Sequence, residues 1–204
     1  MNLIRYDIYQ RRTIIMHHLI IYAHPNDGSF NHHVLSFTQD ILKGKEDTVD
    51  VIDLYHDEFN PVMTKEELAS FSSGVYHDPK AEDYLNRIKA SDHVILIFPV
   101  WRFGPPAILK GFFDKVFIKE AAYLEPEVGN MVGVLGVKKT SVFTTASFDK
   151  DVFEIFGDPI SNTLNQGILN IMGIENATWI HGAPAYLESE RDAFLESIKS
   201  HLNQ

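Results

Sequence analysis

The chain of 204 residues contains no cysteine, so disulfide scaffolds, thiolate metal sites and cysteine nucleophiles are all excluded. Basic residues are also scarce, since 18 Lys and Arg stand against 28 Asp and Glu and give a formal net charge of -10. Nucleic acids and anionic membranes are bound through clustered basic side chains, so neither is an expected partner. No apolar run approaches the ~20 residues of a membrane span, and residues 1–16 lack the apolar core of a secretory signal. We therefore expect a cytoplasmic protein.

Several motifs that mark catalytic or nucleotide-binding sites are missing as well. The sequence has neither a Walker loop nor a G-x-G-x-x-G turn, which disfavours P-loop NTPases and Rossmann dehydrogenases. It has no G-x-S-x-G elbow for a serine hydrolase and no H-E-x-x-H zinc motif. The 10 histidines include two adjacent pairs, at 17–18 and 32–33, whose side chains diverge on any regular element. We expect no catalytic metal.

What the sequence does contain is a regular alternation of strand and helix patterns. Short apolar or β-branched runs predict strands at residues 19–23, 48–54, 94–98, 141–145 and 177–180. Residues 48–54 alternate with polar positions, which suits the edge of a sheet. Helical spacing of apolar residues predicts helices at 31–43, 82–90, 106–118, 160–172 and 188–202. This order predicts an α/β protein with a parallel sheet between two helix layers, in a single domain over residues 17–204 after an N-terminal extension, residues 1–16.

Three unusual segments follow the carboxyl ends of predicted strands, where ligands bind in open parallel sheets. Residues 24–31 offer small polar groups before a helix, which favours binding of an anion such as phosphate; the alternative is an N-cap with a satisfied histidine. Residues 99–106 include Trp101 and Phe103, which suit either a stacked planar ligand or the core. Residues 144–147 supply hydroxyls and backbone N–H groups for the polar edge of such a ring.

The order and spacing of these segments resemble a known family. His24, Ser29-Phe30-Asn31, Asp53-Leu54-Tyr55 and Phe59-Asn60-Pro61 are followed by the more specific run from Phe98 to Gly111, then by Ala122-Tyr123 and Thr144-Thr145. Over roughly residues 17–183 the chain resembles the NAD(P)H:quinone oxidoreductase family of flavodoxin-like proteins. The resemblance implies a three-layer, five-stranded parallel sheet, a bound flavin, and a homodimer with active sites at its interface.

The resemblance also implies roles for individual residues. It implies that the flavin's phosphate portion is held by His24, Ser29, Phe30 and Asn31. It implies that the isoalloxazine ring is surrounded by Pro99, Val100, Trp101, Arg102, Phe103, Thr144, Thr145, Ala146 and Ser147. Tyr123 would be the catalytic residue that faces the nicotinamide and quinone site, from the neighbouring subunit.

The chain departs from the family pattern at three places. Ala146-Ser147 stands where the family often has Gly-Gly, so side chains would crowd the flavin edge or alter its hydrogen bonds. Val152 and Phe156 stand near the positions of a Tyr and a His thought to handle protons. Arg102 separates the aromatic residues Trp101 and Phe103, which are commonly adjacent. Protons would then come from water or from the ribityl hydroxyls.

The resemblance implies a function. We expect a flavoenzyme that passes a hydride from NAD(P)H through bound flavin to a quinone or similar small acceptor. FAD is the expected flavin, with FMN as the alternative. A regulatory subunit of a membrane transport system and a flavodoxin-type electron carrier are the alternative functions.

Overall fold

The computed structural model describes residues 15–45 and 47–204, so residues 1–14 of the predicted extension lie outside the described part. Its centre is a five-stranded parallel sheet in the order β2-β1-β3-β6-β7. The strands are β1 (His17–Tyr22), β2 (Thr48–Asp53), β3 (His93–Pro99), β6 (Lys139–Thr145) and β7 (Ala177–Gly182). The prediction of a parallel sheet is confirmed, and the 48–54 run does form an edge strand.

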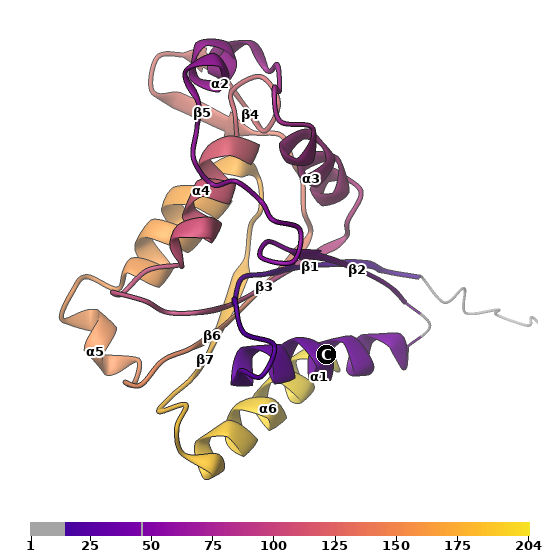
Figure 1. Ribbon diagram of the computed structural model, residues 1–204, viewed down its shortest axis with the longest axis vertical. Helices are drawn as coiled ribbons and strands as arrows, with labels where there is room; N and C mark the ends of the chain where they lie inside the picture. The colour runs from indigo at the N-terminus through magenta and orange to yellow at the C-terminus, as the bar shows by residue number, and fades with distance from the viewer. Residues whose placement is uncertain (1–14, 46) are drawn as a thin grey trace, which may run out of the picture.

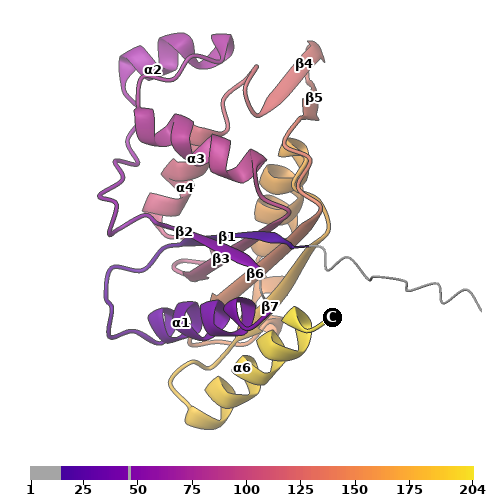
Figure 2. The same cartoon turned by 90° about the vertical axis from the view of Figure 1, so that its right-hand side faces the viewer.

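Helices cover both faces of this sheet (Figures 1 and 2). One layer consists of α1 (Phe30–Lys43) and α6 (Glu188–Leu202), drawn in purple and yellow. The other layer contains α3 (Pro79–Lys89), α4 (Ala107–Val116), the π-helical segment η2 (Ile160–Leu169) and the short 3-10 helix η3 (Asn170–Met172). All five predicted helical regions are therefore helical, although 160–172 has π and 3-10 geometry.

The strands are apolar on both faces because successive side chains point into different helix layers. In β1, Leu19 and Ile21 belong to the core beneath α3 and α4, whereas Ile20 and Tyr22 belong to the core beneath α1 and α6. All seven residues of β3 are buried. Burial from both sides holds the sheet as the rigid platform from which the loops at its carboxyl edge project.

Smaller elements complete the fold. An antiparallel hairpin of β4 (Tyr123–Glu127) and β5 (Asn130–Gly133), the helix α2 (Lys65–Ser70) and the 3-10 helix η1 (Phe71–Ser73) lie at the end of the molecule drawn at the top of Figures 1 and 2. A short helix, α5 (Asp151–Glu154), follows β6. None of these elements was predicted, although the capping box of Thr64 and Glu67 is a sequence signal for α2.

A hydrogen-bonded chain, buried in its middle and partly exposed at both ends, crosses the amino edge of the sheet. His18 Nε2 lies 3.1 Å from an Asp47 carboxylate oxygen, and the Nδ1 atoms of His18 and His93 are 3.0 Å apart. His93 Nε2 lies 2.8 Å from Ser141 Oγ, which is 2.7 Å from His201 Nε2. With neutral rings, a single direction satisfies all four bonds: His18, His93 and His201 each donate one N–H toward Asp47, and His18 and His93 accept at their other nitrogen.

The stability of the fold is expected to fall in mild acid because of this chain. Burial lowers the pKa of His93 to about 2, whereas an unfolded histidine titrates near ~6.5. The unfolded chain therefore gains a proton that the folded chain excludes, and the free energy of unfolding falls below about pH 6.5 by up to about 1.4 kcal/mol per pH unit. Urea unfolding between pH 7.5 and 4.5 measures this slope. His93→Gln, which does not titrate, should show a shallower slope, and equal slopes would contradict the assignment.

Candidate functional site

Thr145, the last residue of β6, joins the three segments singled out in the sequence. Its side-chain oxygen accepts a hydrogen bond from Asn31 Nδ2 at 2.8 Å, from the first turn of α1. Its carbonyl oxygen accepts one from the backbone N–H of Val100 at 2.8 Å, directly after β3. Asn31 and Thr145 are each 5% exposed, so these bonds are shielded from water. The structure therefore brings the three segments together at the carboxyl edge of the sheet.

The first loop, residues 23–29, is folded by its own hydrogen bonds. His24 Nδ1 accepts from the backbone N–H of Asn26 at 3.1 Å, and Asn26 Oδ1 accepts from Gly28 at 2.9 Å. Burial lowers the pKa of His24, so the ring is neutral and carries its proton on Nε2. The hydroxyl of Ser29 caps α1 by accepting from His32 N–H at 3.1 Å. Ser29 is therefore an N-cap, as the alternative interpretation of this segment expected. The Nε2–H group of His24 is left as a donor for a ligand.

The side chain of Asn31 is only partly hydrogen-bonded, which bears on ligand binding. Its Nδ2 atom is used by Thr145, but its buried Oδ1 atom has no hydrogen-bond partner among the described residues. A buried acceptor of this kind requires a donor, which the hydroxyl-bearing ribityl chain of a flavin would supply. Phe30 next to it packs against α6, with the Arg191 guanidinium 5.0 Å from its ring centroid.

The second loop, residues 100–106, begins with a tight turn. Trp101 and Gly104 exchange backbone hydrogen bonds of 3.0 and 3.2 Å. Between them Arg102 and Phe103 have φ of 52° and 64°, in the left-handed region that costs non-glycine residues free energy. Such strain concentrates at ligand sites. The turn leaves Trp101 45% exposed, with its ring centroid 6.2 Å from that of His24. An accessible aromatic face thus lies beside the first loop.

Phe103 points into a separate aromatic cluster. Its ring centroid is 4.2 Å from that of Phe156, 5.0 Å from that of Phe148 and 6.0 Å from that of Phe153. Phe156, the residue near the family's histidine position, therefore covers Phe103 with a ring instead of offering a titratable group. Trp101 is left as the more accessible of the two predicted stacking residues.

The third loop, residues 146–150, continues from β6. Ala146 donates its backbone N–H to the Gly182 carbonyl at 3.2 Å, and its own carbonyl accepts from Ala185 at 2.8 Å. Both backbone groups of Ala146 are therefore occupied by the chain after β7, so its N–H is not available to a ligand. Ser147, the next predicted residue, is exposed. Of the two residues that replace Gly-Gly, Ser147 is the one that faces solvent.

Tyr123 lies elsewhere. It lines an apolar cavity of about 510 Å³ between α4, η2 and the β4–β5 hairpin, and none of the residues predicted to hold the flavin lines this cavity. Its apolar walls include Phe113, Phe117, Met131 and Ile168. Burial raises the pKa of Tyr123, which keeps the phenol protonated at neutral pH. Within one chain, the structure does not bring Tyr123 to the three loops.

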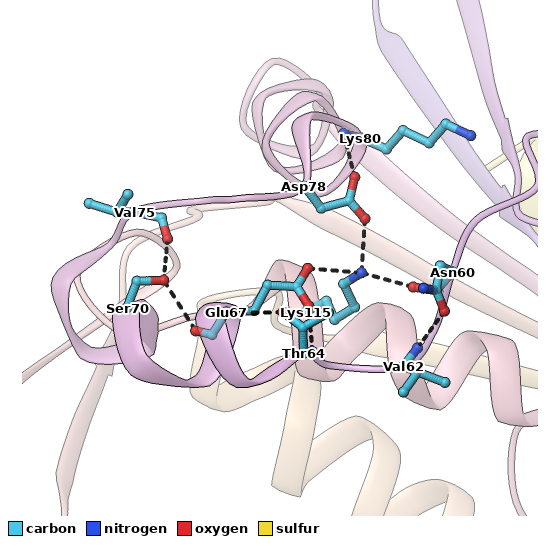
Figure 3. Close-up of polar contacts among 9 residues, drawn as sticks. All are labelled: Asn60, Val62, Thr64, Glu67, Ser70, Val75, Asp78, Lys80 and Lys115. Atoms are coloured by element: carbon cyan, nitrogen blue, oxygen red, sulfur yellow. Dashed lines mark hydrogen bonds and ion pairs between the residues drawn. The ribbon is translucent and has the colours of Figure 1, made fainter.

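One wall of this cavity is held by a buried ion cluster around Lys115 of α4 (Figure 3). The Lys115 ammonium lies 3.0 Å from Glu67 of α2 and 2.9 Å from Asp78, and it donates to the Asn60 carbonyl at 2.9 Å. The segment that contains Glu67 also supplies Met63 and Phe71 to the cavity. Lys115 therefore fixes that segment against α4.

The cluster is tightly packed and almost dry. The side chain of Lys115 is 3% exposed. Burial opposes all three charges, but the mutual hydrogen bonds outweigh it, so the pKa of Lys115 is raised and the pKa values of Glu67 and Asp78 are lowered.

One turn earlier, a Cβ on Gly111 would lie 2.3 Å from the Pro61 carbonyl oxygen, so only glycine permits this approach.

Removing the cation should cost considerable stability. Lys115→Met leaves two carboxylates without their partner, and the free energy of unfolding is expected to fall by about 3 kcal/mol. Lys110→Met on the same helix is the matched control, because Lys110 pairs with Asp114 on the surface at 2.6 Å. That control should lose less than about 0.5 kcal/mol. Urea unfolding compares the two variants, and equal losses would show that the cluster does not hold the segment.

Comparison with known proteins places the chain among relatives of similar fold. Residues 16–204 match a family described as having a flavodoxin-like fold. An uncharacterised NAD(P)H oxidoreductase of Haemophilus influenzae is 35% identical over 164 residues, covering 79% of this chain and 80% of that protein. The structure of Smu.1420 from Streptococcus mutans is 31% identical with a TM-score of 0.79, over 91% of this chain and 98% of that one. The NAD(P)H:quinone oxidoreductase of Methanothermobacter marburgensis is 27% identical with a TM-score of 0.81, over 91% and 96%.

These matches agree with the structure and with the sequence. The sheet order and the two helix layers confirm the predicted three-layer α/β architecture. The relatives confirm the resemblance on which the functional expectations rest. The chain therefore belongs to the flavodoxin-like family that contains the NAD(P)H:quinone oxidoreductases.

Proposed function

We propose that this protein is a cytoplasmic flavin-dependent oxidoreductase that uses NAD(P)H to reduce a quinone or a similar small acceptor. The observation that carries the proposal is the junction at Thr145, which joins a helix N-terminus, an exposed aromatic and a strand end at one edge of the sheet. No helix among the described residues is long and apolar enough to cross a membrane.

The residues of the junction fit a flavin. The N-terminus of α1 has no acidic residue in its first turn, so its free N–H groups and the helix dipole favour a phosphate. The Nε2–H group of His24 adds a donor, and the unpartnered Oδ1 atom of Asn31 suits a ribityl hydroxyl. Trp101 offers a face to the ring. A bound flavin supplies the hydride chemistry, while these residues bind and orient it.

We propose FAD as the flavin, because a second cavity extends from the phosphate end of the site. This cavity, of about 670 Å³, begins at Gly28, Ser29 and Phe30 and continues to Tyr186 and Arg191 before and within α6. Its aromatic and guanidinium groups suit a planar base. FMN is the alternative, because a relative from Mycoplasmopsis synoviae is named an FMN-dependent NADH:quinone oxidoreductase. That relative is 32% identical over 78 residues, which cover 37% of this chain.

Identification of the released cofactor tests the proposal. The purified protein should be yellow, heat should release one FAD per chain, and the protein should oxidise NAD(P)H with menadione as acceptor. Release of FMN would contradict FAD and leave the oxidoreductase in place. A protein that stays colourless when flavin is supplied would contradict the flavin site. Bound flavin without NAD(P)H oxidation would favour the regulatory or electron-carrier alternative.

We also propose that the protein acts as a homodimer in which Tyr123 serves the partner's flavin site. Tyr123 lies in the apolar cavity, apart from the three loops of its own chain. The neighbouring hairpin exposes several large apolar side chains to solvent, namely Leu124, Val128, Met131 and Val132. A patch of this kind is typical of a surface that another chain covers.

A charge in the middle of that surface should break the dimer. Met131 is 44% exposed and lines the cavity, whereas Leu187, equally exposed at 44%, lies at the start of α6. Met131→Asp is expected to shift the protein to monomer and reduce activity, whereas Leu187→Asp should remain dimeric. Light scattering after gel filtration measures the mass of each variant. A wild-type protein that is monomeric at micromolar concentration would contradict the dimer.

A further inference from the structure

A second polar chain, partly buried, lies beneath the third loop. Trp179 of β7 donates its indole N–H to Thr144 Oγ1 at 2.7 Å. The same hydroxyl lies 2.7 Å from Nδ1 of His181, and Nε2 of His181 lies 3.0 Å from the Phe148 carbonyl oxygen. The imidazole thus links both ends of a short stretch: Thr144, where β6 is about to end, and Phe148 in the loop.

The partners determine where the protons lie. A carbonyl oxygen only accepts, so His181 Nε2 carries the hydrogen. In the neutral ring Nδ1 is then the acceptor, and it receives the Thr144 hydroxyl proton. Thr144 Oγ1 in turn accepts from Trp179, which only donates. Every donor and acceptor in the chain is used once in a single direction, so neutral His181 has one tautomer.

The surroundings keep this ring neutral. Burial lowers the pKa of His181. The Phe153 ring stands edge-on to His181 and to Trp179, with centroid distances of 5.2 Å in both cases. The charges that act on the ring are those of Lys150, whose ammonium lies 4.1 Å from the Trp179 ring centroid, and of Asp149. Protonation of Nδ1 would remove the acceptor for Thr144, so a charged ring could not maintain the chain.

The chain also reaches the second loop. Phe148, whose carbonyl His181 holds, packs its ring 5.0 Å from that of Phe103. Phe103 is one of the two residues with left-handed backbone in the turn beside Trp101. Movement of Phe148 would therefore disturb the third loop and the strained turn together.

We propose that His181 is a positioning residue for hydride transfer, acting by fixing residues 144–148 beside the flavin ring. Both of its nitrogens are committed to Thr144 and Phe148, so its role is to hold the loop and not to move a proton. The rate of hydride transfer depends on near contact between the reacting atoms, and displacements of about 1 Å can cost ~100-fold. The inference rests on the proposed function for what the loop borders, whereas the hydrogen bonds belong to the chain itself.

The experiment compares His181→Phe, which keeps the ring shape and loses both bonds, with His181→Gln, which can still donate to Phe148. Hydrogen exchange on the flavin-free protein measures directly how firmly the loop is held. We expect the Ala146 amide, which donates to the Gly182 carbonyl, to exchange at least about 10-fold faster in the Phe variant, and the Gln variant to recover part of the protection. With flavin bound, kcat should fall about 10-fold in His181→Phe, with partial recovery in His181→Gln.

His201→Phe is the matched control, because His201 is also a bonded histidine but lies at the amino edge of the sheet. It should leave exchange of the Ala146 amide unchanged. Nitrogen-15 NMR of wild-type protein at pH 7 should show His181 neutral with its proton on Nε2, a result that does not depend on any variant folding.

The outcomes separate the two proposals. Unchanged loop exchange in His181→Phe, an equal rise in His201→Phe, or a His181 proton on Nδ1 would each overturn the positioning role. Loss of kcat with unchanged exchange would overturn it as well. A wild-type protein that binds no flavin would instead defeat the proposed function, whatever the exchange measurements show.

Discussion

The site depends on one buried threonine at the end of a central strand. Thr145 receives the Asn31 amide at its hydroxyl and the Val100 N–H at its carbonyl, each at 2.8 Å. These bonds fix the loops because the sheet beneath them is rigid: β3 and β6 are buried along nearly their whole length. The sheet brings the ends of β1, β3 and β6 side by side, and the two bonds of Thr145 then tie the chain that follows each strand to its neighbours.

Three further polar networks support different parts of the molecule. The histidine chain from Asp47 to His201 ties strands together at the amino edge, away from the site. The Lys115 cluster fixes the segment around α2 and so shapes the apolar cavity that contains Tyr123. His181 holds the third loop at the carboxyl edge. Each network is at least partly buried, where an unpaired polar group is costly.

The fold and the position of the three candidate loops could be predicted from the sequence. Runs such as 94–98 and helix patterns such as 188–202 are long and regular, so periodicity located them within a few residues. The strand ends also located the loops. Hydrogen bonds between distant residues could not be predicted. The local sequence does not show that Asn31 bonds to Thr145, or that Ala146 donates its N–H to Gly182. His181 was missed because an isolated histidine in a weakly apolar strand carries no sequence signal. The β4–β5 hairpin was missed because Pro126 interrupts any alternating pattern.

The proposed flavin site consists of the three loops joined at Thr145. The most direct measurement is titration of the nitrogen-15-labelled, flavin-free protein with FAD or FMN, followed by backbone NMR. If these loops form the site, the largest chemical-shift changes should fall on residues 28–31, 101–104 and 145–148 together. Changes confined to the cavity around Tyr123 and Met131, with these three loops unaffected, would contradict that assignment.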